Sequence, residues 1–252
     1  MKARNHILET ILFLSLTFSS NYALAKNEWY QVNLIVFSHV TNPTLQEENW
    51  PNKLINPSFK NVISLKPAPL ENEDTSLPPP ISYQLTAPNY LGLTSEAKKI
   101  ARNSSYKIIK HISWLQSAES FKNNKWIHLY GGQTYDEKGQ PINIDQVTNN
   151  ENPSIIPSAD FWELDGKIRI KKSRYFNIST VLYLTLPKSA YGGFNSNYNT
   201  ASFEFQPVPL CSFNLVQQQR TTINKINYFD HPLFGMLVSI TPYKQQHLLT
   251  ER

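Results

Sequence analysis

Apolar and polar residues alternate along residues 175–186, and this alternation constrains the fold more than any other feature of the chain. Apolar side chains share one face of an extended strand: Phe176, Ile178, Leu182, Leu184 and Leu186. The opposite face carries Tyr175, Asn177, Ser179 and Tyr183. A period of two predicts a β-strand with one face against a core and the other in water. Residues 161–171 alternate likewise, with Ile168 and Ile170 opposite Lys167, Arg169 and Lys171.

Other segments extend this pattern to most of the chain. The same reasoning predicts strands at residues 29–39, 106–115, 126–130, 213–229 and 236–243, the last two joined by the turn "DHPLFG". Residues 94–103 form the one clear helix pattern, so the order strand, helix, strand allows one small βαβ-like unit. The fold class expected is α+β: mainly antiparallel β-sheet with one or a few short helices and long irregular loops.

Proline-rich and polar stretches divide the chain. Residues 41–89 and 188–200 read as irregular loops, and the polar loop 136–160 separates two halves. The organisation expected is a signal peptide at 1–25, a strand–helix–strand half at 26–135 and an antiparallel half at 136–252. The two halves can equally form one continuous domain.

The first residues have the three zones of a secretory signal peptide. Lys2 and Arg4 precede the apolar run 11–18, and Ala23-Leu24-Ala25 is a small-x-small cleavage site. The run is shorter than the roughly 20 apolar residues that span a bilayer. No cysteine follows it that could carry a lipid, and no later stretch is apolar enough to cross a membrane. We therefore expect a periplasmic protein without a transmembrane segment in its mature chain.

The net charge limits the classes of binding partner, and the cysteine content limits how the fold is stabilised. Removing Lys2, Arg4 and Glu9 with the signal peptide lowers the net charge from +5 to +4. A mildly basic, exported protein is a poor candidate for nucleic-acid binding and suits a partner that carries carboxylates or phosphates. The single cysteine, Cys211, has no partner in the chain for a disulfide, so the fold depends on its core.

Motifs for catalysis are nearly absent. The chain has no G-x-S-x-G elbow, H-E-x-x-H zinc site or G-x-x-x-x-G-K phosphate loop. Ser95 and Lys98 match S-x-x-K without the accompanying K-T-G. The carboxylates Asp160, Glu163 and Asp165 read as a solvated strand edge, and the spacing of His111, His128 and His231 does not demand a metal. We expect a non-enzyme without a cofactor or metal.

Cations and aromatic rings gather instead on the polar strand faces. The candidate binding residues are Arg169, Lys171, Arg174, Tyr175, Tyr183, Arg220 and Lys225. Flat rings pair with sugar faces and arginine forks pair with carboxylates, and peptidoglycan offers both. The alternative is an ordinary solvated sheet face.

Several segments resemble the CsiV family of periplasmic proteins, in the order that the family has them. They are "WYQVNLIVF" followed by "ENWP" with Trp50, "SSYKIIKHISWLQS" with His111, Trp114 and Gln116, "ELDGKIRIKKSRYFNISTVLYL" with Gly166, Arg174 and Tyr175, and "QQRTTINKINYFDHPLFGMLVSITPY" with Tyr228, Asp230, His231, Pro232, Phe234 and Gly235. The closing "YFDHPLFGMLV" is the most specific of these segments. Its Asp230, Pro232 and Gly235 also have the chemistry of a turn, so this motif is structural or binding.

The resemblance implies a non-enzymatic, peptidoglycan-binding accessory protein. Through it we expect a role in cell-wall assembly with a bifunctional penicillin-binding protein and its outer-membrane lipoprotein activator. Two alternatives remain open at this point: a protein-interaction scaffold that does not touch glycan, and a cell-wall hydrolase or transpeptidase of unrecognised type.

Overall fold

A computed structural model describes residues 28–40, 53–69, 79–142, 161–187 and 209–243, and shows two β-sheets. The first sheet has the strand order β10 (Ile226–His231), β11 (Phe234–Tyr243), β1 (Trp29–His39), β4 (Tyr106–Ser117), β3 (Gln84–Leu85). The second has the order β2 (Val62–Ile63), β5 (Trp126–Tyr135), β7 (Phe161–Lys172), β8 (Phe176–Pro187), β9 (Leu210–Thr221), with β6 (Pro141–Ile142) beside β5. These strands pair antiparallel except β2 and β5, which are parallel.

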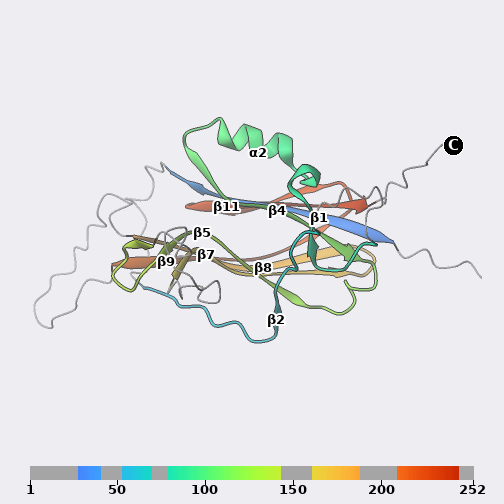
Figure 1. The fold of residues 1–252 in the computed structure, drawn as a ribbon, viewed down its shortest axis with the longest axis horizontal. Coiled ribbons are helices and arrows are strands. Elements are labelled where there is room, and N and C mark those ends of the chain that lie inside the picture. Colours follow the sequence, from blue (N-terminus) through green and yellow to red (C-terminus); the bar gives the residue numbers. More distant parts are fainter. Residues whose placement is uncertain (1–27, 41–52, 70–78, 143–160, 188–208, 244–252) are drawn as a thin grey trace, which may run out of the picture.

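The two sheets face each other across one hydrophobic core (Figure 1). Alternation explains which residues enter it, because β7 and β8 turn their apolar positions toward the first sheet. The second sheet contributes Ile127, Leu129, Leu164, Ile168, Ile170, Ile178, Leu182, Leu184, Phe213 and Leu215. The first sheet contributes Val32, Leu34, Val36, Trp114, Phe229, Met236, Val238 and Ile240. The inner face of each sheet is therefore occupied, and only the outer faces are left for function.

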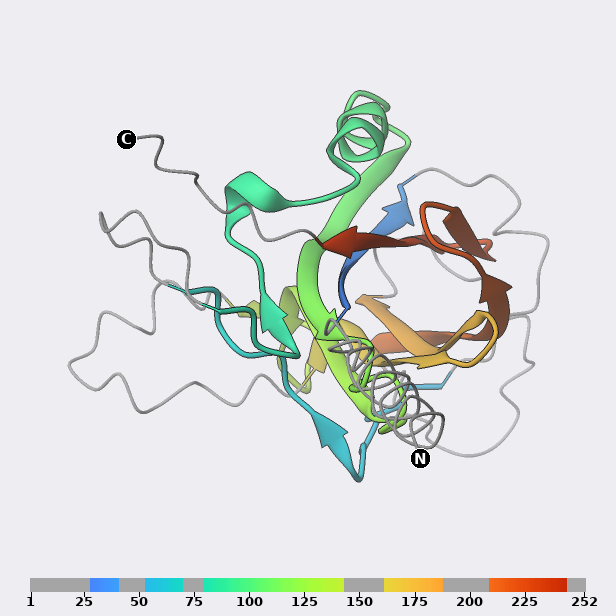
Figure 2. The same ribbon diagram turned by 90° about the vertical axis from the view of Figure 1, so that its right-hand side faces the viewer.

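A short helix covers part of the outer face of the first sheet. Helix α2 (Thr94–Ala101) follows the 3₁₀ turn η2 (Pro88–Tyr90) and packs Ala97 against Ile35 and Phe37 of β1. Strand β1 is thus buried on both faces along most of its length, as its two-sided apolar sequence predicts. Figure 2 shows α2 on the far side of the first sheet from the gold β8 strand. No helix among the described residues has the length and apolar character needed to span a membrane.

Several predictions from the sequence are confirmed by these elements. The chain is mostly antiparallel β-sheet with a single short α-helix among the described residues, and β1 has the bounds 29–39 that alternation predicted. Both sheets draw strands from the two halves of the chain, since β11 lies beside β1 and β7 beside β5. The predicted signal peptide, Trp50 and much of the predicted loop sequence lie outside the described residues.

Three predictions about elements are wrong. The βαβ-like unit does not form, because β1 and β4 pair antiparallel. Strand β5 does not end at the glycine pair after Tyr130 but continues through a bulge to Tyr135. Residues 213–229 are not one strand: β9 ends at Thr221 in the second sheet, and β10 begins at Ile226 in the first.

Candidate functional site

The outer face of the second sheet collects most of the cations that the sequence predicted as binding residues. Its register places Lys171 opposite Asn177, and Asn177 opposite Arg220. Arg169 lies one step along the same face, opposite Ser179. Because neighbouring strands are about 4.8 Å apart, Lys171 and Arg220 are roughly 10 Å apart across β8. These residues come from strands that are distant in sequence, and the sheet brings them into one row.

Trp126 on β5 holds two of the cations. The Arg169 guanidinium carbon lies 4.3 Å from the centre of the Trp126 ring, and Lys167 Nζ lies 4.9 Å from it. Lys167 Nζ is also 5.4 Å from the ring centre of Phe59. Distances below about 6 Å over a ring face are those of cation–π contacts. Trp126 and Phe59 therefore fix where these charges stand.

Tyr175 holds a second pair of cations at the end of the same face. The guanidinium carbons of Arg174 and Arg220 lie 5.6 and 5.2 Å from the centre of its ring. Tyr175 lies in the turn between β7 and β8, where Ser173 N–H donates a hydrogen bond to the Tyr175 carbonyl at 3.0 Å. The turn thus brings Arg174 next to Arg220 of the neighbouring β8–β9 pair, and both arginines are exposed.

An extended segment, residues 53–63, crosses the outer face from one edge of the sheet to the other, and we call it the strap. It begins at β9, where Ser212 N–H donates to the Lys53 carbonyl and Ile55 N–H donates to Ser212 Oγ, both at 3.0 Å. It ends at β5, where Val62 pairs with Trp126. In Figure 1 it is the cyan chain that runs along the outer side of the second sheet to β2.

The strap divides the outer face into a covered and an open part. The ring centre of Phe59 lies 5.5 Å from His128 and 6.5 Å from Tyr183. Tyr183 is therefore packed beside the strap, apart from the row of Lys171, Asn177 and Arg220. The open part is defined by Trp126, Lys167, Arg169, Lys171, Arg174, Tyr175, Asn177, Ser179, Gln218 and Arg220.

The cations of this open part have no acidic partners among the described residues. The structure records no ion pair there for Lys167, Arg169, Lys171, Arg174 or Arg220. The acidic residue of β7 on this face, Asp165, lies 2.6 Å from His128 Nε2 and is paired with it. Uncompensated positive charge gathered on one face favours a negatively charged ligand.

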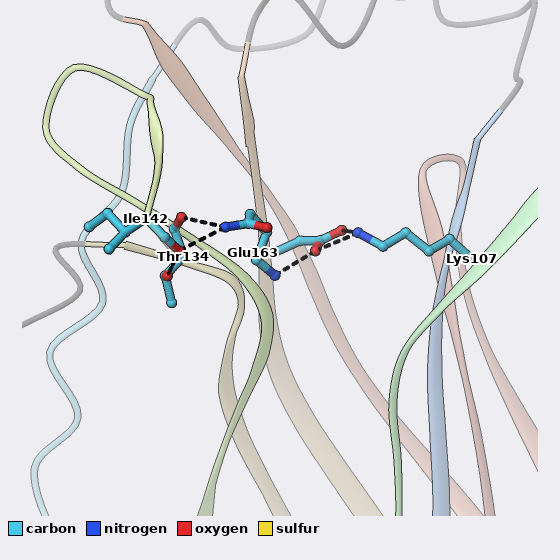
Figure 3. A network of polar contacts seen from close by, with 5 residues as sticks. Lys107, Thr134, Ile142 and Glu163 are labelled. Carbon is cyan, nitrogen blue, oxygen red and sulfur yellow. Dashed lines mark hydrogen bonds and ion pairs between the residues drawn. The ribbon is translucent and has the colours of Figure 1, made fainter. Parts of the chain in front are cut away.

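Glu163 was predicted to lie on a solvated edge, and this prediction is wrong. Its side chain is 2 % exposed and accepts hydrogen bonds from Lys107 Nζ at 2.8 and 2.9 Å and from Gln133 N–H at 2.8 Å (Figure 3). Lys107 comes from β4, so this contact joins the two sheets. Gly132 has φ +78°, and a Cβ there would lie 2.5 Å from the Glu163 carboxylate. The carboxylate is occupied by structural contacts at the β5 bulge.

His111 and Trp114 also have structural contacts. His111 Nε2 lies 2.7 Å from the Gly92 carbonyl, to which it donates, and so fixes the segment that leads into α2. Trp114 is fully buried, and its indole N–H donates to Gln116 Oε1 at 3.2 Å. No group of three or more histidine, cysteine or acidic side chains among the described residues could hold a metal.

The β10–β11 hairpin carries the remaining motif residues, with Tyr228 and Asp230 on the outer face of the first sheet. Tyr228 O–H donates to Asp230 Oδ1 at 2.6 Å, and burial, reinforced by this hydrogen bond, raises the pKa of Tyr228. Leu233 N–H donates to His231 Nδ1 at 3.1 Å, and burial lowers the pKa of His231 to about 4.

Two further residues of the motif make the turn compact. The Pro232 carbonyl lies 2.8 Å from Nδ1 of His39, which donates to it. A Cβ at Gly235 would lie 2.7 Å from the rings of both Phe37 and Tyr228, so the close stacking of those rings requires glycine. These contacts account for the motif as a folding element, while Tyr228 remains 44 % exposed.

Lys225 is a further predicted binding residue that stands apart from the open face. Lys225 lies in the turn between β9 and β10, where the chain leaves the second sheet for the first, and Asn224 beside it has φ +61°. Trp50 lies outside the described residues. The sequence interpretation missed Trp126 and Phe59 as supports for the cations. The alternation of Trp126 with the buried Ile127 could have shown that Trp126 points outward, whereas Phe59 lies in a segment without periodicity.

Comparison with known proteins gives one match. The family model described as "Peptidoglycan-binding protein, CsiV" matches residues 8–243, which is nearly the whole chain. Neither a curated protein nor a solved structure matches it.

Proposed function

Because this chain belongs to the CsiV family of peptidoglycan-binding proteins, we propose that it binds peptidoglycan through the open outer face of its second sheet. It does so in the periplasm, after removal of residues 1–25, as a non-enzymatic accessory protein. Its role is to support cell-wall assembly through a bifunctional penicillin-binding protein and the outer-membrane lipoprotein that activates it.

The observation that carries this proposal is the set of cations without counter-ions. Arg169, Lys171 and Arg220 stand on one face and have no carboxylate partner among the described residues. Peptidoglycan carries free carboxylates on its stem peptides, and an arginine fork binds a carboxylate through two parallel hydrogen bonds. The wall thus supplies the charge that this face lacks.

The contacts of Ser95 support a role without catalysis. The S-x-x-K pattern would need the hydroxyl of Ser95 to face Lys98 as its base. Ser95 Oγ instead donates to Glu96 Oε2 at 2.7 Å on the exposed side of α2. The buried carboxylate of Glu163 is likewise engaged by Lys107 and a backbone N–H.

The opposite side of the molecule offers a surface for the protein partners. Tyr106 and Tyr228 are exposed beside Phe37, with ring centres 5.5 and 6.3 Å from its own. Exposed aromatic rings of this kind are enriched where proteins bind one another. This surface also favours the second candidate function, a protein-interaction scaffold that does not touch the wall.

Sedimentation with purified sacculi tests the proposal. The double variant Arg169→Glu with Arg174→Glu should bind sacculi about tenfold or more weakly at low salt, and the difference should shrink at high salt because exposed charges are screened. The matched control, Lys98→Glu with Lys99→Glu, makes the same charge change on exposed positions of α2 and should bind as wild type does. Circular dichroism must show that both variants fold. Wild-type binding by the folded Arg169/Arg174 variant would favour the scaffold function instead.

A further inference from the structure

The aromatic rings of the open face are already occupied by cations. Trp126 has Arg169 and Lys167 over its ring, at 4.3 and 4.9 Å, and Tyr175 has Arg220 and Arg174, at 5.2 and 5.6 Å. A ring that stacks on a sugar needs its face open to the ligand. The ring face that a guanidinium or ammonium group covers is closed to a sugar.

Between the cations lie polar side chains that are free to bind a peptide. Asn177 and Ser179 of β8 stand between β7 and β9, and the structure records no hydrogen bond from either side chain to a described residue. Gln218, beside Ser179, is exposed, and its side chain likewise has no recorded hydrogen bond to a described residue. Amide and hydroxyl groups can donate to and accept from peptide bonds. The middle of this face thus offers hydrogen bonds, and its border offers positive charge.

From this arrangement we infer that the open face recognises the stem peptides of peptidoglycan through their free carboxylates, and that Trp126 and Tyr175 position the cations. The inference rests on the proposed function and names the part of the wall that is bound. Arg169, Lys171 and Arg220 hold the carboxylates, and Asn177 and Ser179 bind the peptide bonds between them. The glycan strand contributes little to this contact.

The dimensions of the face match a short peptide. Lys167 and Lys171 are four residues apart on β7, or about 13 Å at the rise of a β-strand. Arg220 is roughly 10 Å from Lys171 across two strand spacings. An extended peptide of four residues also spans about 13 Å. Carboxylates at different positions of one stem peptide can therefore reach different cations.

The first test separates peptide from glycan. The mature protein is titrated with intact sacculi, with glycan strands from which an amidase has removed the stem peptides, with a soluble stem tetrapeptide, and with the same tetrapeptide whose carboxylates are amidated. We expect the stripped glycan to bind about tenfold or more weakly than sacculi, and only the tetrapeptide with free carboxylates to compete. Stripped glycan that binds as well as sacculi overturns the inference and leaves the proposed function intact. Binding to none of these ligands overturns both.

The second test asks what the Trp126 ring does. Trp126→Leu should weaken tetrapeptide binding about fivefold, because the ring no longer holds Arg169 and Lys167, and Trp126→Phe should restore most of it. Tyr90→Leu removes a ring that is 53 % exposed elsewhere on the molecule and serves as the control. All variants are checked by circular dichroism. If Trp126→Leu keeps tetrapeptide binding and loses stripped-glycan binding, the ring stacks on sugar and the inference is wrong.

Discussion

Arg169 combines a charge and a ring contact in a way that lysine would not reproduce. Its guanidinium is stacked 4.3 Å from the centre of the Trp126 ring, and its Nε has no hydrogen-bond partner among the described residues. A planar guanidinium can stack on a ring while its remaining N–H groups point to a ligand, whereas an ammonium is a point charge. At the scale of single residues, the open face therefore depends on the kind of cation as well as on the charge.

Thr180 lies on the inner face of β8, so its hydroxyl is buried in the core. The residue is 1 % exposed, and Oγ1 has no hydrogen-bond partner among the described residues. Thr180→Val replaces the hydroxyl with a methyl group and should raise the free energy of unfolding by about 1 kcal/mol, because an unpaired buried hydroxyl is costly. Urea denaturation measures the change. Ser113→Ala is the contrasting variant, because Ser113 Oγ donates to Asn33 and accepts from Gly92 N–H. This substitution should lower the free energy of unfolding by about 1 kcal/mol.

His231 should make stability depend on pH. Burial lowers its pKa from 6.5 to about 4, with nearby His39 acting in the same direction and Asp230 opposing it. Between these values the unfolded chain binds more protons than the folded one, so stability is complete above pH 6.5 and falls as the pH drops toward 4. His231→Asn keeps an acceptor for Leu233 N–H and removes the titrating ring, so its stability should fall less over this window. Denaturation midpoints at several pH values measure this, and equal slopes in both proteins would refute it.

At the scale of elements, the boundaries that the sequence pattern missed are those set by partners far along the chain. The glycine pair after Tyr130 predicts a strand end, yet β5 continues because Glu163 of β7 accepts Gln133 N–H at the bulge. The sequence pattern predicts one strand over 213–229, yet the chain turns at Asn224 and changes sheets. Neither cause is visible in a local pattern of residues.

Side chains then reconnect the two strands that this turn separates. Gln217 and Gln219 of β9 donate through Nε2 to the carbonyls of Asp230 and Tyr228 on β10, at 2.9 and 2.7 Å. Strand β10 is at the edge of its sheet, and an unpaired edge invites pairing with another chain. These two amides occupy edge carbonyls that would otherwise be open.

The contact between Lys107 and Glu163 should matter to stability more than the other lysine–glutamate contacts. Glu163→Ala should lower the free energy of unfolding by about 2 kcal/mol, because it removes the buried acceptor of Gln133 N–H, whereas the Lys107 side chain is 53 % exposed and water can solvate its charge. Lys122→Ala breaks a pair with Glu119 in which both side chains are largely exposed, and should change it by less than about 0.5 kcal/mol. Chemical denaturation compares the two variants. Similar small effects would show that Glu163 does not tie the sheets together.

At the scale of the whole molecule, the sequence predicted which side chains of a strand point outward, but it predicted less well which strands lie side by side in a sheet. Alternation in β7 and β8 places Arg169 and Lys171 opposite the buried Ile168 and Ile170, and the structure agrees. It could not place Trp126 of β5 against Arg169, or bring the strap across the sheet, because sheet order is decided by packing between distant segments. The sequence therefore predicted the outward position of these cations and missed the residues that support them.

The two outer faces of the molecule differ in character. The second sheet presents cations without acidic partners among the described residues, whereas the first sheet is covered in part by α2 and presents Tyr106 and Tyr228. In the function proposed above, the second sheet holds the wall and the outer face of the first sheet is available to a protein.

Chemical labelling of lysines, read by mass spectrometry with and without sacculi, tests most directly whether the second sheet binds the wall. Lys167 and Lys171 lie on the open face, whereas Lys98 and Lys99 are exposed on α2. We expect sacculi to protect Lys167 and Lys171 from the reagent and to leave Lys98 and Lys99 as reactive as before. Protection of Lys98 and Lys99 with unchanged labelling of Lys167 and Lys171 would contradict this account.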